Sequence, residues 1–271
     1  MEHIRQAIER AKAEGVIAPK PLAEAPLSAA ATATRGARAF REVEVDRAHI
    51  EARRIIAHQA ADPRSKSFDM MRTQTLQAMD QSHWKFLGIT SPSAACGKTL
   101  TAVNLALSVS RQPERSVLLI DLDFHKPQVA DCLGLRTKHG VVGVLDGQIT
   151  LADALIEARV GNLRMLVLPA ESRVIDSGEL IASRAMTKML QEIKRTFPSH
   201  IVIMDLPPLL TSDDVIALLP QIDCILLVAA VGTSTISEIK ESNRHLQSSA
   251  VLRIVLNKAS EPAAGHYYGQ Y

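Results

Sequence analysis

The sequence predicts an α/β fold in which a parallel β-sheet is flanked by helices, and three observations predict it. Six short segments are apolar throughout, as strands buried on both faces of a parallel sheet are. Segments with helical character separate them, and this alternation implies parallel strands with right-handed crossovers. The first strong strand runs through a short loop, ending in Gly97-Lys98-Thr99, into a helix, which is the arrangement of a P-loop NTPase-like domain.

Residues 1–42 are predicted to form a helical and linker extension outside this domain. Residues 2–14 place four apolar side chains on one helical stripe, either as a docking helix or as a frayed end. Residues 18–38 are rich in Ala, Pro, Ser and Thr without periodicity, which indicates a linker. The small basic run nearby is read as solvated linker charge, with contact to anionic lipid as the alternative; it comprises Arg35, Arg38 and Arg41.

The folded domain is predicted over residues 43–258. It opens with a short strand at 43–45, followed by helices at 48–60 and 66–79. The apolar strands of the sheet are expected at 85–90, 117–121, 163–168, 201–205, 223–229 and 251–257. The helices between them are expected at 99–111, 150–158, 178–196, 212–219 and 234–247.

Composition narrows the functional class. Apolar residues make up 46% of the 271 residues and charged residues 22%, as in ordinary globular proteins. The formal net charge of +2 gives no argument for a nucleic-acid partner. The three Cys residues lack paired spacing, so the sequence predicts neither a disulfide framework nor a zinc site. This pattern favours a reducing compartment. No apolar run has the length of a membrane span, so we expect a cytoplasmic protein that reaches a membrane only through a partner.

The loop between the first strong strand and its helix is predicted to bind phosphate. A loop there points backbone N–H groups and the positive end of the helix at its ligand. Lys98 would pair with the β- and γ-phosphates, and the Thr99 hydroxyl would coordinate Mg²⁺. The common pattern G-x-x-x-x-G-K-[ST] is incomplete, because Pro92 stands at its first Gly. The ATP-binding residues are expected to be Ala94, Ala95, Cys96, Gly97, Lys98, Thr99 and Leu100.

Three carboxylates and one amide follow strands of the same predicted sheet. Asp121 and Asp123 end one strand, Asp205 ends another, and Asn257 ends the last. Ligands of open α/β sheets bind beyond the carboxyl ends of the strands. One Asp in such a place is usually a cap or turn former, but three beside a Gly-Lys-Thr loop indicate Mg²⁺ binding or acceptance of a proton. The amide of Asn257 would suit a purine base.

All three tyrosines, Tyr267, Tyr268 and Tyr271, lie in the last five residues. A globular core normally distributes this residue through its strands. Residues 259–271 are therefore expected to form a short flexible C-terminal tail. It is either a solubilising end or, because a phosphate donor site lies upstream, a set of phenols that accept phosphate.

With these motifs in order, residues 40–271 resemble the bacterial tyrosine kinases of exopolysaccharide and capsule synthesis, which are deviant P-loop ATPases related to partition ATPases. The loop TSPSAACGKT (90–99) is similar to the family's T-S-P-x-P-G-E-G-K-[ST], which also has Pro at the position of Pro92. Residues 121–127 match its D-x-D-x-R-x-P, and residues 205–208 match its D-x-P-P. A C-terminal tyrosine cluster is the family's autophosphorylation site.

The chain departs from the family pattern at three places. Ala94, Ala95 and Cys96 replace Pro, Gly and an acidic residue, and a Cβ at position 95 restricts a loop in which Gly allows positive φ. His125 and Lys126 stand where Arg is usual. The helical motif E-x-x-R-x-x-R, which the family uses for ring assembly, aligns with Lys66, Asp69 and Arg72, two of them with reversed charge.

The resemblance implies transfer of the ATP γ-phosphoryl group to the tyrosine tail, with ATP and Mg²⁺ as cofactors. It assigns Lys98 to the phosphates, Thr99, Asp121 and Asp205 to the metal, and Asp121 or Asp123 to the tyrosine proton. The implied partners are a membrane polysaccharide co-polymerase as activator, further copies of the chain, and a cognate tyrosine phosphatase. The protein would then lie peripherally at the inner membrane. Two alternatives stay open: an ATPase switch of the partition type, and a catalytically degenerate scaffold.

Overall fold

The computed structural model describes residues 40–247 and 250–259, all of which belong to the unit formed by residues 39–271. The predicted helix at 2–14, the linker at 18–38 and the three tyrosines lie outside the described residues. Among the helices that are described, none is long and apolar enough to cross a membrane.

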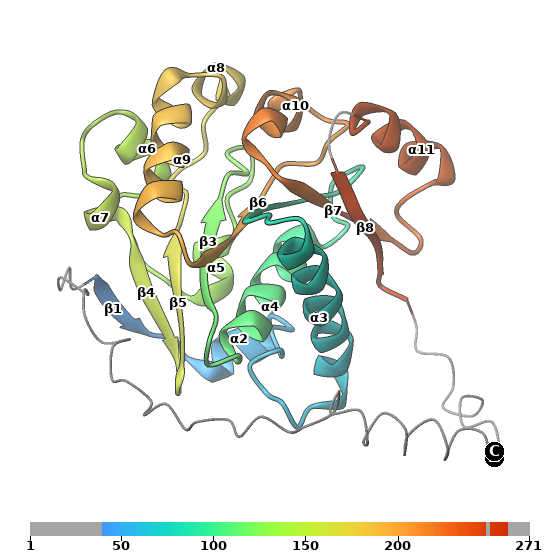
Figure 1. The fold of residues 1–271 in the computed structure, drawn as a ribbon, viewed down its shortest axis with the longest axis horizontal. Coiled ribbons are helices and arrows are strands. Elements are labelled where there is room, and N and C mark those ends of the chain that lie inside the picture. Colours follow the sequence, from blue (N-terminus) through green and yellow to red (C-terminus); the bar gives the residue numbers. More distant parts are fainter. Residues whose placement is uncertain (1–39, 248–249, 260–271) are drawn as a thin grey trace, which may run out of the picture. The chain divides into compact units, whose positions relative to one another are not determined.

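An eight-stranded sheet forms the centre of the domain (Figure 1), in the order β1-β4-β5-β3-β6-β2-β7-β8. All neighbouring strands are parallel except β4 and β5, so β1 and β4 run opposite to the other six. The strands are β1 (Arg41–Glu44), β2 (Phe86–Thr90), β3 (Ser116–Asp121), β4 (Ile156–Val160), β5 (Leu163–Leu168), β6 (His200–Asp205), β7 (Cys224–Ala230) and β8 (Ala250–Asn257). The predicted α/β class is confirmed, and the sheet is mixed at one edge.

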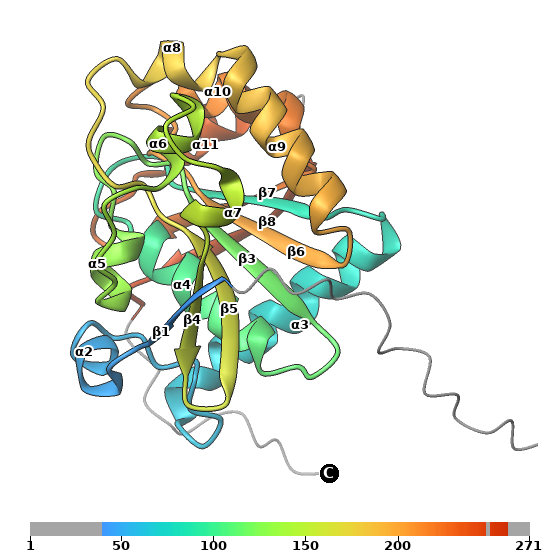
Figure 2. The same ribbon diagram turned by 90° about the vertical axis from the view of Figure 1, so that its left-hand side faces the viewer.

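Helices cover both faces of the sheet (Figure 2). One face carries α2 (Arg47–Ala52), α3 (Lys66–Gln81), α4 (Lys98–Ser110) and α5 (Val129–Leu133). The other carries α6 (Val141–Leu145), α7 (Leu151–Ala154), α8 (Ser177–Ile181), α9 (Arg184–Thr196), α10 (Asp214–Leu218) and α11 (Ile236–His245). Successive residues of a strand point to opposite faces. Leu119 of β3 therefore packs under α4 while Leu118 packs in the opposite cluster, and each must be apolar.

The predicted helix at 48–60 is wrong beyond residue 52. After Arg53 the chain turns at Arg54, whose φ is 62°, and continues through loops and turns instead of a helix. Ile55 and Ala57 are fully buried there. The Oδ1 atom of buried Asn104, on α4, accepts hydrogen bonds from the backbone of Ile56 and Ala57 at 2.9 and 3.0 Å. A side chain far away in the sequence thus satisfies amides that a helix would otherwise satisfy.

The predicted helix at 150–158 is confirmed at 151–154 and wrong beyond residue 154. Helix α7 stops at Ala154, and residues 156–160 form β4, which pairs with β5 around a turn at Gly161 with φ of 60°. Along β4 the burial alternates, because Glu157 and Arg159 face outward between buried apolar neighbours. The helix expected at 178–196 is two helices, since Ser183 caps a new helix by accepting from Met186 N at 3.1 Å. Helices α5 and α6 were not predicted.

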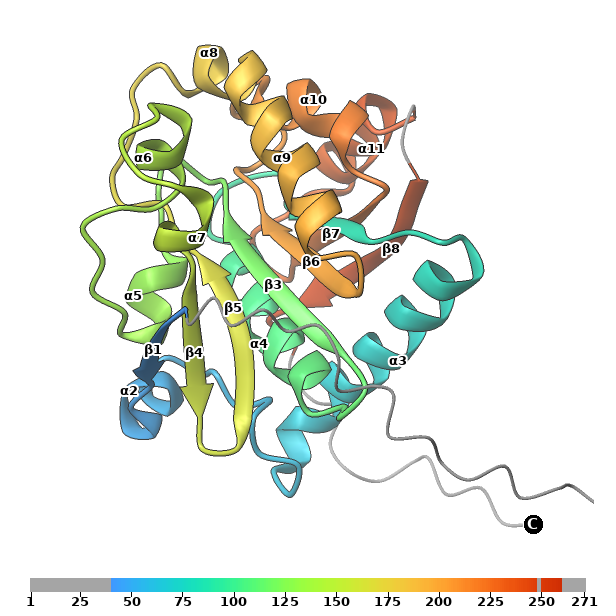
Figure 3. The ribbon, with the colours of Figure 1, turned by 60° about the vertical axis from the view of Figure 1, so that its left-hand side comes forward.

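Strand β8 forms an edge of the sheet. Its apolar sequence predicted burial on both faces, and this prediction is wrong. Ile254 is 50% exposed and Leu256 is 60% exposed. Strand β7 pairs with β8 on one side, and β8 ends the sheet on the other. Figure 3 shows β8 at the edge opposite to β1 and β4.

Candidate functional site

The loop of residues 91–97 connects β2 to α4 at the carboxyl edge of the sheet. It is attached to the segment after β6, because Leu209 N donates to Ser91 O at 2.8 Å and Leu210 N donates to Pro92 O at 3.1 Å. Gly97 caps α4 with φ of 92° and without a side-chain hydrogen bond. An added Cβ on Gly97 would lie 2.2 Å from Asn257 Nδ2, so both conformation and space require glycine. The first turn of α4 keeps its N–H groups for an anion.

Ala95 adopts φ of 61°, in the left-handed region that favours glycine. Ala94 has no positive φ. The folded loop therefore holds Ala95 in a strained backbone conformation, as expected from the Cβ at this position.

Replacing Ala95 with Gly should stabilise the protein by up to about 1 kcal/mol, because the left-handed conformation costs glycine little. Ala94→Gly is the matched control and should destabilise it by about 0.5–1 kcal/mol, since it only adds freedom to the unfolded chain. Urea denaturation of the two variants measures the difference. Stability changes of equal size and the same sign in the two variants would show that the backbone at Ala95 is not strained.

Lys98 is held between two carboxylates beneath the loop. Its Nζ atom lies 2.6 Å from Asp123 Oδ2 and 3.4 Å from Asp205 Oδ1. The Thr99 hydroxyl donates to Asp205 Oδ2 at 2.6 Å. All four side chains are buried, and Asp205 is fully so. The structure therefore brings together the predicted lysine, the predicted threonine and two of the three predicted aspartates.

Asp121 joins this cluster from the neighbouring strand. It lies opposite Asp205 in the register of β3 and β6. Its Oδ2 atom accepts from the backbone of Gln128 and Val129 at 3.0 and 2.9 Å, and its Oδ1 atom accepts from Asp123 N at 3.2 Å. The loop after β3 thus folds around the Asp121 carboxylate. The sequence analysis did not identify these backbone donors.

Burial and charge shift the pKa values of the cluster. Burial, together with the nearby Asp205 carboxylate, raises the pKa of Asp121 to about 8. Burial raises the pKa of Asp205 as well, against the opposing effect of Lys98. Burial alone would lower the pKa of Lys98, but Asp205 and Asp123 outweigh it and the net pKa is raised. The lysine therefore stays charged, and Asp121 and Asp205 hold protons more tightly than free carboxylates do.

The donor atoms of the cluster fit Mg²⁺. The ion prefers hard oxygen ligands and usually keeps several waters beside one or two carboxylates. Thr99 Oγ1 and the Asp205 carboxylate already lie within hydrogen-bond distance, and Asp121 lies across from Asp205. Among the described residues no group of three or more acidic, His or Cys side chains is arranged to hold a metal ion by itself. Phosphate oxygens and water would complete the shell.

Asn257 lies against the phosphate loop. Its Nδ2 atom donates to Cys96 O at 2.8 Å, and its Oδ1 atom accepts from Lys258 N at 2.8 Å. Contact with a purine base therefore remains a prediction for this amide. The Cys96 side chain is 1% exposed, and its Sγ atom lies 3.2 Å from Ser234 Oγ.

His125, which stands where the family has Arg, contacts two groups on the helices above the site. Its Nε2 atom lies 3.0 Å from Asp214 Oδ2 and 3.1 Å from Ser177 Oγ. Ser177 also donates to Asp214 at 2.7 Å. These contacts attach the loop that holds Asp123 to α8 and α10. A lone His in a loop gives no sequence signal for such a role.

The three residues aligned with the family's assembly motif differ in their surroundings. Asp69 accepts from Arg111 Nη1 and Ser108 Oγ, both at 2.8 Å, and from Arg72 Nη1 at 3.2 Å. Asp69 and Arg72 therefore connect α3 to α4 within one chain. Lys66 is exposed at the start of α3.

Comparisons with known proteins agree with this geometry. A family model described as an AAA domain matches residues 87–247, which is more than half of the chain. Tyrosine-protein kinase CpsD of Streptococcus agalactiae serotype Ia is 30% identical over 183 residues, covering 66% of this chain and 77% of that protein. The crystal structure of the chimerical protein CapA2B2 superimposes with a TM-score of 0.70 at 23% identity, covering 82% of this chain and 94% of that one.

A longer relative matches only in part. Putative tyrosine-protein kinase EpsB of Ralstonia nicotianae is 26% identical over 216 residues, which are 78% of this chain but 28% of EpsB. The chain thus spans little more than a quarter of that relative. With the phosphate loop, the buried lysine and the three aspartates in one site, the sequence and the structure agree: this chain belongs to the AAA domain family and, within it, to the bacterial tyrosine kinases.

Proposed function

We propose that the chain is an ATP-dependent protein-tyrosine autokinase that regulates exopolysaccharide or capsular polysaccharide synthesis and export. One observation carries the proposal: Lys98 is buried between Asp123 and Asp205 at the mouth of a phosphate loop, with the Thr99 hydroxyl on Asp205. The tyrosine tail and the relatives named tyrosine-protein kinases support tyrosine as the acceptor.

In the proposed reaction the phenol oxygen of a tail tyrosine attacks the γ-phosphorus of ATP. A bond forms between these two atoms, the bond from phosphorus to the β–γ bridging oxygen breaks, and ADP leaves. The phenol proton passes to Asp123 or Asp121. The protein contributes mostly positioning and charge neutralisation. The acceptors would be Tyr267, Tyr268 and Tyr271.

Lys98 would change partners when ATP binds. In the structure its Nζ atom lies 2.6 Å from Asp123 Oδ2. A bound phosphate would attract the same ammonium group, since charge-assisted hydrogen bonds to phosphate are strong. Asp123 would then lose its cation and become free to accept a proton. Backbone amides of residues 94–100 would hold the phosphates, and Thr99, Asp121 and Asp205 would hold Mg²⁺.

The proposal includes partners that the sequence implies. A membrane polysaccharide co-polymerase would activate the kinase and bring it to the inner membrane. Further copies of the chain would supply the tails, and a cognate phosphatase would reset them. Because Asp69 and Arg72 bond within one chain, assembly would use Lys66 or other surfaces.

Incubation of the purified chain with Mg-ATP, followed by intact mass and peptide mapping, tests the proposal. We expect mass gains of one to three phosphates on Tyr267, Tyr268 and Tyr271. Replacement of all three tyrosines by Phe is the matched control, since it keeps the active site and removes the acceptors.

The same experiment separates the alternatives. Turnover of ATP without phosphate on the tail, with an activator fragment also present, would indicate a partition-type ATPase switch. Failure to bind ATP at all would indicate a scaffold. Either result would exclude the autokinase.

A further inference from the structure

The loop after β3 carries Asp123, one of the two carboxylates proposed to take the tyrosine proton. On either side of Asp123, Leu122 and Phe124 are fully buried in the apolar cluster on one face of the sheet. Burial of apolar side chains is not directional, whereas a hydrogen bond is. The apolar pair therefore holds the loop at its depth, and the polar contacts of the loop decide where the Asp123 carboxylate points.

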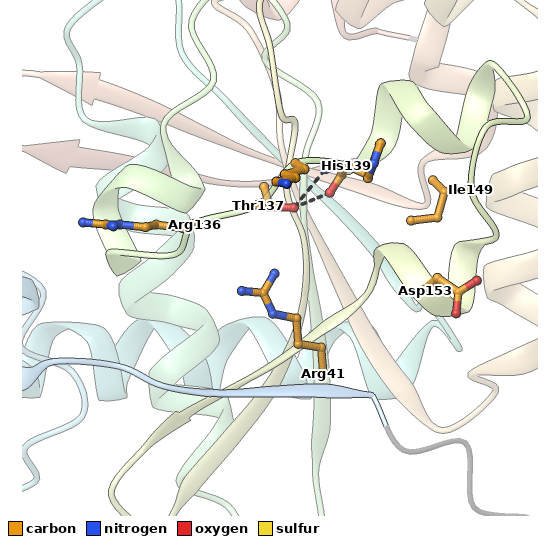
Figure 4. Close-up of a pocket in the computed structure, with 7 residues that line it drawn as sticks. Arg41, Arg136, Thr137, His139, Ile149 and Asp153 are labelled. Atoms are coloured by element: carbon orange, nitrogen blue, oxygen red, sulfur yellow. Dashed lines mark hydrogen bonds between the residues drawn. The ribbon is translucent and has the colours of Figure 1, made fainter.

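One flank of this loop borders solvent. Lys126 and Pro127 line a hollow of about 490 Å³. A second hollow, of about 390 Å³, adjoins it at Arg136 and Thr137, and Figure 4 shows this second hollow between β1 and the loop that contains Thr137. Because open space lies on this flank, the position of the loop depends on the contacts of its other flank.

His125 makes the side-chain contacts of that other flank. Its Nε2 atom lies 3.0 Å from Asp214 Oδ2 and 3.1 Å from Ser177 Oγ. Ser177 Oγ gives its one proton to Asp214 Oδ2 at 2.7 Å, so between the two side chains the Nε2–H of His125 must be the donor. One residue earlier, Phe124 O accepts from Val174 N at 3.0 Å. Backbone and side chain thus both attach the loop to the segment that leads into α8.

Asp214 connects His125 to the phosphate loop. It is 1% exposed, and a buried carboxylate costs free energy unless donors satisfy it. Asp214 begins α10, directly after the segment that continues from Asp205, and the backbone of that segment donates to Ser91 and Pro92. The contacts of His125 therefore fix the loop of Asp123 relative to the loop that would hold ATP.

We propose that His125 is a positioning residue for phosphoryl transfer, which keeps Asp123 directed at the acceptor phenol. This rests on the proposed autokinase function. In the structure Asp123 contacts Lys98 Nζ at 2.6 Å and accepts from Lys126 N at 2.9 Å. ATP would draw Lys98 to its phosphates, and of these two contacts the one to Lys126 would remain. Lys126 belongs to the same loop, so attachment of the loop through His125 supplies the fixed position.

His125→Leu removes the Nε2 donor and is tested in the full chain with Mg-ATP. We expect the kcat of tail phosphorylation to fall about 10–100-fold, because a displaced proton acceptor loses much of its effect. KM for ATP should stay unchanged, since the contacts of His125 are to Asp214 and Ser177. His125→Gln should restore most of the rate, because Gln Nε2 can donate from nearly the same place.

His245→Leu is the matched control and should change neither kcat nor KM. The His245 side chain is 42% exposed, against 41% for His125, and it also lies beside a carboxylate, 3.5 Å from Glu241 Oε1. It lies on α11, away from the loop of Asp123. The control therefore matches the loss of a half-exposed imidazole beside an acid and leaves the proposed contacts in place.

Hydrogen exchange followed by mass spectrometry gives a readout that does not depend on kinase activity. The N–H of Val174 lies in the segment 171–176, whose sequence is the same in all these variants, and Phe124 O protects it. His125→Leu should raise the exchange rate of this segment about tenfold, because the loop opens more often without its side-chain hydrogen bonds. His125→Gln and His245→Leu should leave the rate unchanged.

Ser177→Ala removes one acceptor of the His125 proton, so it should lower kcat less strongly, and it replaces His125→Leu if that variant does not fold. Unchanged kcat in His125→Leu would overturn the proposal, as would a raised KM with kcat kept, or an equal loss in His125→Gln. A lowered kcat without faster exchange of residues 171–176 would also overturn it. Each of these results leaves the autokinase standing if the unchanged chain phosphorylates its tail. A tail without phosphate in the unchanged chain would exclude the autokinase and the positioning role together.

Discussion

Replacing Lys98 with Met should reduce phosphoryl transfer by about 10²–10³-fold, the cost of removing one preorganised charge donor from a transition state. Lys98 is the cation nearest to the phosphate loop and is buried with its partners. Met has a similar length, so the cavity is filled while the charge is lost. The rate of phosphate incorporation into the tail, or of ADP release, measures the effect at a temperature where both proteins are folded.

The same substitution should also lower the stability of the ATP-free protein. Removing one partner of a buried ion pair costs about 3–5 kcal/mol, because the other partner stays buried without compensation. The loss should be smaller at acidic pH, where the Asp205 carboxylate, whose pKa burial raises, can take up a proton instead. Lys240→Met, on the surface of α11, is the matched control and should change neither quantity. Activity close to that of the unchanged protein would show that Lys98 does not act on the phosphates.

The stability of the ATP-free protein should fall as the pH rises from about 4 to about 8. Burial, with the neighbouring Asp205, raises the pKa of Asp121 from 3.8 to about 8. Within this interval the folded protein holds a proton that the unfolded chain has released, so rising pH favours unfolding. If Asp121 carried the whole change, the free energy of unfolding would fall on the order of 5 kcal/mol.

The raised pKa of Lys98 does not alter this window. A lysine whose pKa is raised on folding contributes stability below its unfolded value, and loses it only as the pH rises through the folded value. Lys98 therefore contributes no change in stability between acidic and neutral pH.

Urea denaturation at a series of pH values measures this dependence. Asp205→Asn should make the decline shallower, because the loss of its charge lowers the pKa of Asp121. Asp176→Asn, at an exposed carboxylate without a side-chain hydrogen bond, should leave the slope unchanged. Stability that stays level or rises between pH 5 and pH 8 would show that Asp121 is ionised throughout.

The phosphate site could be predicted from the sequence because its parts follow from local pattern and sheet geometry. A Gly-Lys-Thr triplet after a strand forms the loop, and the carboxyl ends of parallel strands meet at one edge. Asp121 and Asp205 therefore had to lie close together, and the register of β3 and β6 places them opposite each other. The strain at Ala95 was likewise expected from its Cβ, and φ of 61° confirms it.

The errors in the predicted elements come from interactions between distant residues. The helix expected at 48–60 ends early because Asn104 binds the amides of Ile56 and Ala57. Residues 156–160 alternate over too short a length to distinguish a strand from a helix, and pairing with β5 decided the outcome. The apolar sequence of β8 did not reveal that it is an edge strand, because its place depends on the order of the whole sheet.

The sequence by itself determined the α/β class, the phosphate loop and the acidic residues that face it, because these depend on side-chain type and on spacing along one strand, loop or helix. Only the tertiary structure decided that Lys98 pairs with Asp123 and Asp205, that Asp69 and Arg72 bond within one chain, and that His125 attaches the loop of Asp123 to α8 and α10. These features join segments far apart in the chain. Their distances are set by the packing of the sheet and its helices, which no local pattern encodes.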